Sequence, residues 1–316
     1  MKILVTIYPF GEKGNEPQRL LNGFDISYNE QKRKYNSNEL GVVLQKINPK
    51  IIIAGTEKYD AQTLDLCPNL KMISRAGVGI DSIDLNECDR RGIVVTYTPK
   101  AAIHAVAELT IGQMFNCLRH IQKVSGGWQR YIGKSIRNCV IGVFGYGNIG
   151  SELVDKLQSL QPKKILVNDL DNSKLQKLVG ADIASKDEII EQADIITFHI
   201  PLIEPKLNPG YDNTNFFSQN ELSRLKPEAI IINTSRGGII NETDLCEWLK
   251  NNPKALAAID VFCEEPYQGP FASLDNAYLT PHLGSCTDEC RAIMEVEAVQ
   301  EVLNFINKKT NLNRVV

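Results

Sequence analysis

The chain has 316 residues, and at about 150 residues per domain this length provides for about two domains, each with its own core. Its 35 basic and 38 acidic side chains give a net charge of -3, with 23% charged and 43% hydrophobic residues. This composition is typical of globular proteins and excludes disordered and collagen-like sequence. The near-neutral balance, with no Lys/Arg cluster, predicts that nucleic acid is not a partner.

The N-terminal segment is too poor in apolar residues for a signal peptide or a membrane span, because only residues 3–7 precede a polar stretch. The 8 cysteines form no CxxC pair, and Cys286 and Cys290 lack further ligands for zinc. We therefore expect a cytoplasmic protein with reduced cysteines, no metal site and no membrane contact.

Short β-branched runs alternate with helical segments along the chain, which predicts parallel βαβ units with strands buried on both faces. The predicted strands are residues 3–7, 51–54, 71–74 and 93–96, followed by a second series at 140–144, 165–168, 195–199, 230–233, 257–261 and 278–280. Residues 102–122 are predicted to form a long buried helix between the two series. A final helix is expected at 285–308, capped by Ser285.

Residues 201–217 interrupt this alternation with three prolines, a glycine and three asparagines. Such long loops are often functional lids, and a surface excursion without a role is equally compatible with the sequence. Ser218 and Glu221 form an S-x-x-E capping box, which predicts that a helix begins there.

A glycine loop follows the first strand of the second series. Gly145, Gly147 and Gly150 have G-x-G-x-x-G spacing, directly after a strand and before a helix. Glycines at these positions permit a tight turn, close approach of backbone N–H groups to a pyrophosphate, and close packing of helix on strand. We expect Asn148 and Ile149 to belong to the same phosphate-binding turn, although a glycine-rich turn without a ligand would have the same spacing.

An acidic residue follows the next predicted strand. Asp169 lies nineteen residues after Gly150, where a carboxylate can accept hydrogen bonds from a ribose diol. Leu170 and Asp171 follow instead of an arginine, so a 2′-phosphate would meet acidic groups. The glycine loop and Asp169 together predict NAD as the cofactor, in preference to NADP.

Three more motifs follow in order: NTSRGG at 233–238, DVFCEEP at 260–266 and PHLGS at 281–285. Together with ISRAGVGIDSID at 73–84, they resemble the D-isomer-specific 2-hydroxyacid dehydrogenase family, especially its 3-phosphoglycerate dehydrogenase-like members. Each motif alone could be a strand-end turn or a solvated loop, and it is their joint order that carries the resemblance.

The resemblance implies an α/β protein with two doubly wound, Rossmann-like parallel-sheet domains and a cleft between them. Residues 1–98 with 286–316 would form the substrate-binding domain, and residues 99–285 the NAD-binding domain. It further implies that the protein forms a homodimer. The small molecules that it would bind are NAD and a small 2-hydroxy or 2-keto acid.

The resemblance places the catalytic roles on Arg236, Glu265 and His282. Interconverting a 2-hydroxy and a 2-keto acid requires a hydride acceptor, a group that takes the hydroxyl proton, and a cation for the carboxylate. His282 is suited to take up the proton, because imidazole titrates near neutral pH. Glu265 would orient the imidazole ring and favour imidazolium. The planar guanidinium of Arg236 can bind the substrate carboxylate with two parallel hydrogen bonds. The further expected cofactor contacts are His199, Pro201, Thr234, Ser235, Asp260 and Gly284, with Asp260 contacting the nicotinamide carboxamide. The expected substrate contacts are Arg75, Gly77, Val78, Gly79 and Lys100.

The sequence departs from the family where TPG and a following asparagine are common, since Thr98 and Pro99 are followed here by Lys100, Ala101 and Ala102. Without that amide, phosphoglycerate itself is less favoured, and Lys100 could hold a phosphate or second carboxylate or be solvated. Two other functions are compatible with the motifs. One is an NAD-binding regulator without activity, like the corepressors that resemble this family. The weaker one is a formate dehydrogenase, which has glutamine where Glu265 stands.

Overall fold

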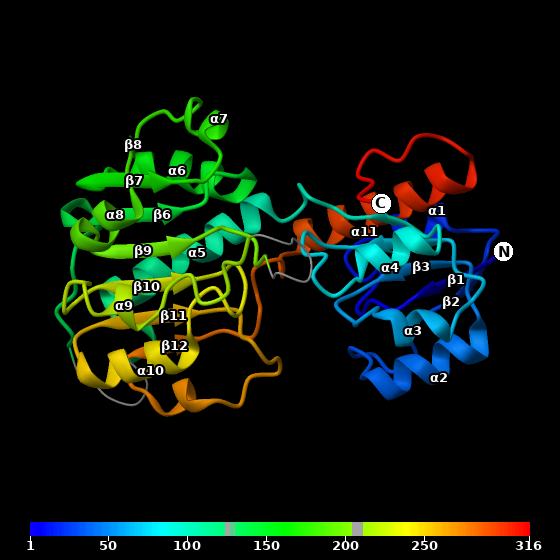
Figure 1. Ribbon diagram of the computed structural model, residues 1–316, viewed down its shortest axis with the longest axis horizontal. Helices are drawn as coiled ribbons and strands as arrows, with labels where there is room; N and C mark the ends of the chain where they lie inside the picture. Colours follow the sequence, from blue (N-terminus) through cyan, green and yellow to red (C-terminus); the bar gives the residue numbers. More distant parts are fainter. Residues whose placement is uncertain (124–127, 129, 204–210) are drawn as a thin grey trace. The chain divides into compact units, whose positions relative to one another are not determined.

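The computed structural model describes residues 1–123, 128, 130–203 and 211–316. These residues form two compact units, which we call unit 1 (Met1–Ala102 with Ser285–Val316) and unit 2 (Ile103–Gly284). The blue and red ends of the chain in Figure 1 therefore belong to the same unit. The boundaries expected from the sequence were 98/99 and 285/286. No helix in the described part of the chain has the length and apolar character needed to cross a membrane.

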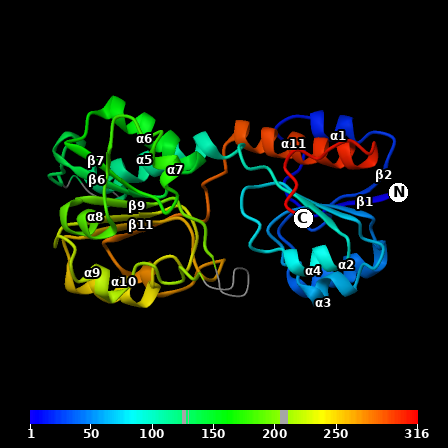
Figure 2. The ribbon, with the colours of Figure 1, turned by 45° about the horizontal axis from the view of Figure 1, so that its top comes forward.

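Unit 1 contains a five-stranded sheet in which all strand pairs are parallel. In sheet order, its strands are β2 (Asp25–Ser27), β1 (Lys2–Val5), β3 (Ile51–Ala54), β4 (Met72–Arg75) and β5 (Val94–Thr96). One face is covered by α1 (Glu16–Leu20) and α11 (Asp288–Ile306), and the other by α2 (Ser37–Ile47), α3 (Ala61–Asp65) and α4 (Leu85–Arg90), as Figure 2 shows.

Unit 2 contains a seven-stranded sheet, again parallel throughout. In sheet order, its strands are β12 (Ala277–Leu279), β11 (Leu256–Ile259), β10 (Ile230–Asn233), β9 (Ile195–Phe198), β6 (Val140–Phe144), β7 (Lys164–Asn168) and β8 (Asp182–Ile183). One face carries α5 (Ile103–Arg119) and α6 (Asn148–Leu160), and the other α8 (Lys186–Gln192), α9 (Gln219–Leu222) and α10 (Glu242–Asn251), while the one-turn helix α7 (Asn172–Leu175) follows β7.

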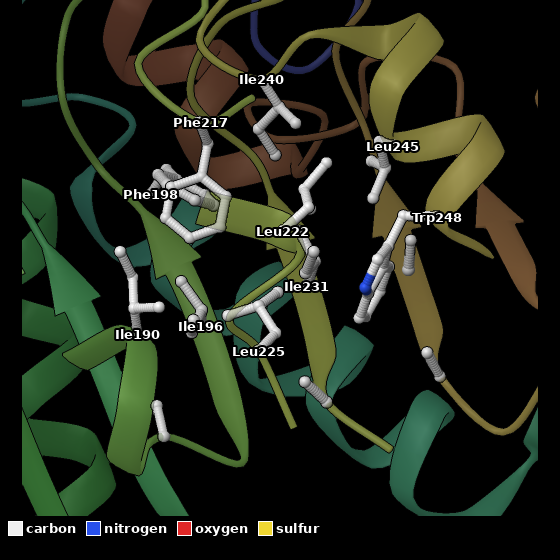
Figure 3. Packing of buried hydrophobic residues seen from close by; sticks show 14 of the residues in the cluster. Ile190, Ile196, Phe198, Phe217, Leu222, Leu225, Ile231, Ile240, Leu245 and Trp248 are labelled. Atoms are coloured by element: carbon white, nitrogen blue, oxygen red, sulfur yellow. The ribbon is translucent and has the colours of Figure 1, made fainter. Parts of the chain in front are cut away.

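The hydrophobic core of unit 2 lies on both faces of this sheet. Every residue of β6, β9, β10 and β11 is buried, which explains why these strands are continuous apolar runs rather than alternating ones. Figure 3 shows the face under α8 to α10, where Phe198, Phe217 and Trp248 pack with isoleucines and leucines. The predicted fold class, two doubly wound parallel α/β sheets, is confirmed.

Several element boundaries differ from the sequence prediction. The short edge strands β2 and β8 were not predicted, because both are polar in part and neither β8 residue is buried. The final helix begins at Asp288 and its cap is Thr287, whose side chain accepts a hydrogen bond from the Cys290 N–H. The prediction of Ser285 as the cap was therefore wrong: Ser285 lies in a turn, and the helix begins only after Thr287, whose backbone is extended.

The interrupted segment 201–217 is described at its two ends, and residues 204–210 lie outside the described residues. Asn213 ties these ends together, since its side chain accepts from Ile203 N at 2.7 Å and donates to the Pro201 carbonyl at 2.7 Å. Helix α9 then begins after Ser218, whose N–H and hydroxyl both donate to Glu221 Oε2 at 2.9 Å. The predicted capping box is confirmed.

Candidate active site

The predicted site residues of unit 2 lie at one edge of its sheet. Five strands are each followed immediately by a predicted site residue or motif: Gly145 after β6, Asp169 after β7, His199 after β9, Thr234 to Arg236 after β10 and Asp260 after β11. The PHLGS motif, with His282, begins two residues after the end of β12. Because parallel strands all end at the same edge, the sheet gathers motifs that are far apart in the sequence. The strand order reverses between β6 and β9, and ligands of doubly wound sheets bind at such a switch point.

The glycine loop lies at this switch point and packs closely against the backbone that follows β9 and against its own helix. Gly145 has φ +98°, and a Cβ atom there would lie 2.4 Å from the His199 carbonyl oxygen. A Cβ atom on Gly150 would lie 1.9 Å from the Gly145 carbonyl oxygen. Both positions therefore require glycine, since any side chain would push the loop away from β9 or from its own helix.

The N-terminus of α6 fits an anionic group. Its N-cap is Gly147, no side chain caps the helix within the described residues, and space is open where a Gly147 side chain would stand. The N–H groups of the first turn, which includes Asn148 and Ile149, therefore have no side-chain acceptor at the positive end of the helix dipole. This arrangement fits the pyrophosphate of a dinucleotide.

Asp169 is held between two turns. Its Oδ2 atom accepts from Tyr146 N in the glycine loop at 2.6 Å, and its Oδ1 atom accepts from Asp171 N at 2.8 Å. The remaining lone pairs of the carboxylate can accept from a ribose diol. Lys174, which the sequence analysis missed, places its Nζ atom 3.8 Å from Asp169 Oδ1 because α7 turns it back toward β7.

His282 and Glu265 are brought together by the loops after β11 and β12. His282 Nδ1 lies 2.8 Å from Glu265 Oε2, and the other carboxylate oxygen of Glu265 accepts from Phe262 N at 3.2 Å. The glutamate is thus fixed by its own loop and fixes the imidazole in turn. This pairing directs Nδ1 to the carboxylate and Nε2 away from it.

Arg236 lies in the turn that follows β10. The Asn233 side chain builds this turn: it donates to the Arg236 carbonyl at 2.8 Å and accepts from Ser235 N at 3.0 Å. A Cβ atom on Gly237 would come within 2.2 Å of the Phe262 carbonyl oxygen, so the first and second motifs pack backbone against backbone. The arginine therefore starts from a rigid turn in contact with the loop that carries Glu265.

Thr234 and Asp260, two of the predicted cofactor contacts, are buried and hydrogen-bonded. Thr234 is buried, and its hydroxyl lies 2.9 Å from that of Thr110 in α5. Asp260, only 1% exposed, accepts from Leu283 N at 2.7 Å and from Gly284 N at 3.0 Å. Burial is the largest influence on its carboxyl and raises the pKa of Asp260.

The sequence analysis also missed Thr280, whose hydroxyl donates to Asp260 Oδ1 at 2.6 Å. The signal that could have found it is its position immediately before the PHLGS motif. Among the described residues, no group of three or more His, Cys, Asp or Glu side chains could hold a metal ion.

His199 is unsuited to acid-base chemistry. Its Nε2 atom lies 3.0 Å from Thr197 Oγ1, whereas its buried Nδ1 atom has no hydrogen-bond partner in the described part of the chain. Burial lowers the pKa of His199 to about 3, so the ring stays neutral near pH 7. The Pro201 side chain is exposed, and its carbonyl serves the Asn213 contact described above.

The predicted substrate residues belong to unit 1. Arg75 ends β4 and is 9% exposed; its guanidinium donates to the carbonyls of Ala76 and Gly79 and so supports the glycine turn. Gly77 N donates to Thr98 Oγ1 at 2.7 Å, which leaves that N–H unavailable to a ligand.

The next N–H groups of the turn, those of Val78 and Gly79, have no acceptor among the described residues. Lys100 is exposed and opposes the effect of burial on Glu297 in α11, where burial raises the pKa of the carboxyl.

Comparison with known proteins gives a consistent assignment. The family model described as "D-isomer specific 2-hydroxyacid dehydrogenase, NAD binding domain" matches residues 111–284. The chain is 30% identical over 282 residues to a glyoxylate reductase of Thermococcus litoralis, covering 84% of this chain and 83% of the relative. It is 29% identical over 314 residues to a D-3-phosphoglycerate dehydrogenase of Archaeoglobus fulgidus, covering 96% of this chain and 57% of the relative.

A solved structure supports the same assignment. The TT0316 protein of Thermus thermophilus superimposes with a TM-score of 0.87 at 25% identity, and both chains are covered completely. The matched family segment contains the glycine loop, Asp169 and almost all of the three later motifs, so NAD is the cofactor. The chain therefore belongs to the D-isomer specific 2-hydroxyacid dehydrogenase family of NAD-dependent oxidoreductases.

Proposed function

We propose that this enzyme interconverts a small D-2-hydroxy acid and its 2-keto acid, with Arg236, Glu265 and His282 as its catalytic residues. The observation that carries this proposal is the 2.8 Å contact between His282 Nδ1 and Glu265 Oε2, at the sheet edge that also carries the glycine loop. A histidine oriented by a carboxylate is the arrangement that general acid-base catalysis requires.

Each group has a defined task in this reaction. Bound NAD supplies the hydride acceptor. His282 takes the hydroxyl proton at Nε2 during oxidation and returns it to the oxygen during reduction. Glu265 keeps the ring in this orientation through the contact between its Oε2 atom and His282 Nδ1. The planar fork of Arg236 can hold the carboxylate and the neighbouring oxygen of the substrate together.

The decisive experiment is NADH oxidation by the purified full chain against a panel of 2-keto acids. The panel contains singly anionic compounds, such as glyoxylate and hydroxypyruvate, and compounds with a phosphate or a second carboxylate. Turnover of at least one of them is the expected result. Tight NADH binding without turnover of any member would contradict the proposal and favour an NAD-binding regulator.

We further propose that the preferred substrate carries a second anionic group, because Lys100 replaces the glycine that is common at this position in the family. Lys100→Ala should raise the KM of the best doubly anionic substrate by up to about fivefold, since one exposed charge pair contributes about 0.2–1 kcal/mol. The KM of a singly anionic substrate should stay constant. Lys71→Ala removes an exposed lysine beside the opposite end of β4 and is the matched control. This role would be refuted if Lys100→Ala had the same KM as wild type for the doubly anionic substrate as well as for the singly anionic one.

Cofactor preference is expected to depend on Asp169. Asp169→Ala should lower the ratio of kcat/KM for NADH over NADPH by about tenfold, because it removes both the ribose acceptor and the charge that repels a 2′-phosphate. Asp169→Asn keeps the size of the side chain and separates the loss of charge from disturbance of the Tyr146 contact. An unchanged ratio in both variants, or a wild-type enzyme that prefers NADPH, would contradict this assignment.

We also propose a homodimer, because three large apolar side chains of unit 2, Ile121, Trp128 and Ile132, are exposed by 59%, 96% and 96%. They lie within twelve positions of the sequence, and a contiguous exposed apolar patch is typical of an interaction surface. Light scattering should give twice the chain mass of 35.3 kDa, and a monomer at micromolar concentration would contradict the proposal.

A further inference from the structure

The backbone at His282 adopts a conformation that must be held from outside. Its φ of +55° lies in the left-handed region, which is unfavourable for a residue with a side chain. The His282 N–H donates to the Asp260 carbonyl at 2.9 Å and to the Thr280 carbonyl at 3.0 Å. The direction of the imidazole therefore depends on Asp260 and Thr280.

The Asp260 side chain holds the two residues that follow. Oδ1 accepts from Leu283 N at 2.7 Å, and Oδ2 accepts from Gly284 N at 3.0 Å. Backbone and side chain of one residue thus clamp the whole turn of residues 282–284. Because this carboxylate is buried, its alignment is determined by its hydrogen-bond partners rather than by solvent.

Thr280 also contacts the Asp260 carboxylate, through its side-chain hydroxyl. Its hydroxyl donates to Asp260 Oδ1 at 2.6 Å and accepts from Gln113 Nε2 at 3.4 Å, while Asn116 Nδ2 donates to Gln113 Oε1 at 3.1 Å. The three polar side chains Thr280, Gln113 and Asn116 therefore form a hydrogen-bonded row from α5 to the carboxylate, in which Gln113 and Asn116 are buried and Thr280 is partly buried. A hydroxyl that accepts from Gln113 has its single hydrogen directed at Asp260.

We propose that Thr280 is a positioning residue that fixes the Asp260 carboxylate and through it the catalytic orientation of His282. This inference rests on the proposed catalytic role of His282. Thr280 does not need to touch substrate or cofactor, because its only task is to keep the acceptor of the 282–284 turn in place. The hydrogen bond also favours the charged form of Asp260 and opposes the effect of burial on its pKa.

The test compares Thr280→Val, which keeps the shape and removes the hydroxyl, with Thr280→Ser, which restores it. Thr280→Val should lower kcat for keto-acid reduction by about tenfold or more, because a misplaced acid-base group loses its reactive geometry. The dissociation constant of NADH should change much less than kcat, because the glycine loop and Asp169 hold the rest of the dinucleotide. Thr280→Ser should recover most of kcat.

The matched control is Thr96→Val. Thr96 is 0% exposed and donates to Ser74 Oγ at 3.1 Å in unit 1, so this variant also loses a threonine hydroxyl bonded to a side-chain oxygen, away from the 282–284 turn. It should keep the kcat of wild type. An equal loss of kcat in Thr96→Val and Thr280→Val would show a general effect of removing a bonded threonine hydroxyl and would overturn the inference.

The pH profile gives a readout that loss of packing would not shift. Without the Thr280 bond, the pKa of Asp260 should rise further, so that the carboxylate is protonated at a higher pH. The acid limb of kcat should therefore move to higher pH in Thr280→Val and return in Thr280→Ser. In the described part of the chain, the titratable groups in contact with the turn include Asp260, Glu265 and His282 itself, and the Glu265 contact does not involve Thr280.

Amide hydrogen exchange tests the geometry independently of activity. The Leu283 and Gly284 amides should exchange faster in Thr280→Val, whereas the Gly145 amide, which donates to the Asn168 carbonyl, should be unchanged. If Thr280→Val does not fold, Asp260→Asn, which keeps the shape and removes the charge, must show the same loss of kcat.

Two outcomes separate this inference from the proposed function. Full activity of His282→Ala would refute the catalytic role itself. An inactive His282→Ala together with a Thr280→Val enzyme that has wild-type kcat, pH profile and exchange would refute only the positioning role. Weaker NADH binding at an unchanged kcat would also overturn it, since Thr280 would then serve the cofactor.

Discussion

Replacing His282 with alanine should lower kcat for keto-acid reduction by about 10²–10⁴-fold, the range typical of a positioned acid-base group. The proton that the substrate oxygen takes up would then have to come from water. NADH affinity should stay close to that of wild type, because the glycine loop and Asp169 hold the dinucleotide at other strands of the sheet. Steady-state kinetics and NADH fluorescence titration measure the two effects separately.

Chemical rescue sharpens this prediction. The His282 side chain is 44% exposed, so added imidazole should reach the vacated position and restore part of the activity of His282→Ala. Glu265→Gln is the matched, milder variant: it keeps the size of the partner and an oxygen that can accept from Nδ1, and it removes only the charge. Its kcat should fall less than that of His282→Ala. A His282→Ala enzyme with full activity, or a Glu265→Gln enzyme with a lower kcat than His282→Ala, would remove the basis for the proposed mechanism.

The central strands could be predicted because burial on both faces leaves only apolar residues there. The runs 140–144 and 230–233 agree with β6 and β10 to the residue. The edge strands β2 and β8 lack this constraint, since an edge strand is short and partly solvated. Pairing with a neighbour, which local sequence does not encode, makes them strands.

The candidate site was predictable to the extent that its residues lie in contiguous motifs. His282 and Glu265 are only 17 positions apart, and their motifs follow strands that are neighbours in the sheet. Thr110 and Thr234 are 124 positions apart, and no local pattern connects a helical threonine with a strand end. Arg75 shows a related limit: the resemblance implies a substrate contact for it, and the sequence does not reveal that its guanidinium also donates to carbonyls of its own turn.

Arg236→Ala should have the second large effect and a different kinetic signature. Two charge-assisted hydrogen bonds to the substrate, at about 1.5–3 kcal/mol each, correspond to a loss of about 10²–10⁴-fold in kcat/KM at 1.4 kcal/mol per tenfold. KM should rise and kcat should fall together, because one guanidinium holds both the carboxylate and the oxygen on which charge develops. NADH binding should be nearly unchanged.

The lysine variant distinguishes charge from geometry at this position. Arg236→Lys keeps the positive charge and loses the planar fork, so KM should recover in part while kcat stays low. Arg137→Ala is the surface control: Arg137 is exposed, donates to Gln161 Oε1 at 2.8 Å and should be dispensable for turnover. If Arg236→Ala raised only KM and left kcat at the wild-type value, Arg236 would bind ground state and transition state equally. The proposed role of Arg236 in stabilising the developing charge would then be wrong. Among the three proposed catalytic residues, His282 alone would stabilise the charge on the substrate oxygen in the transition state.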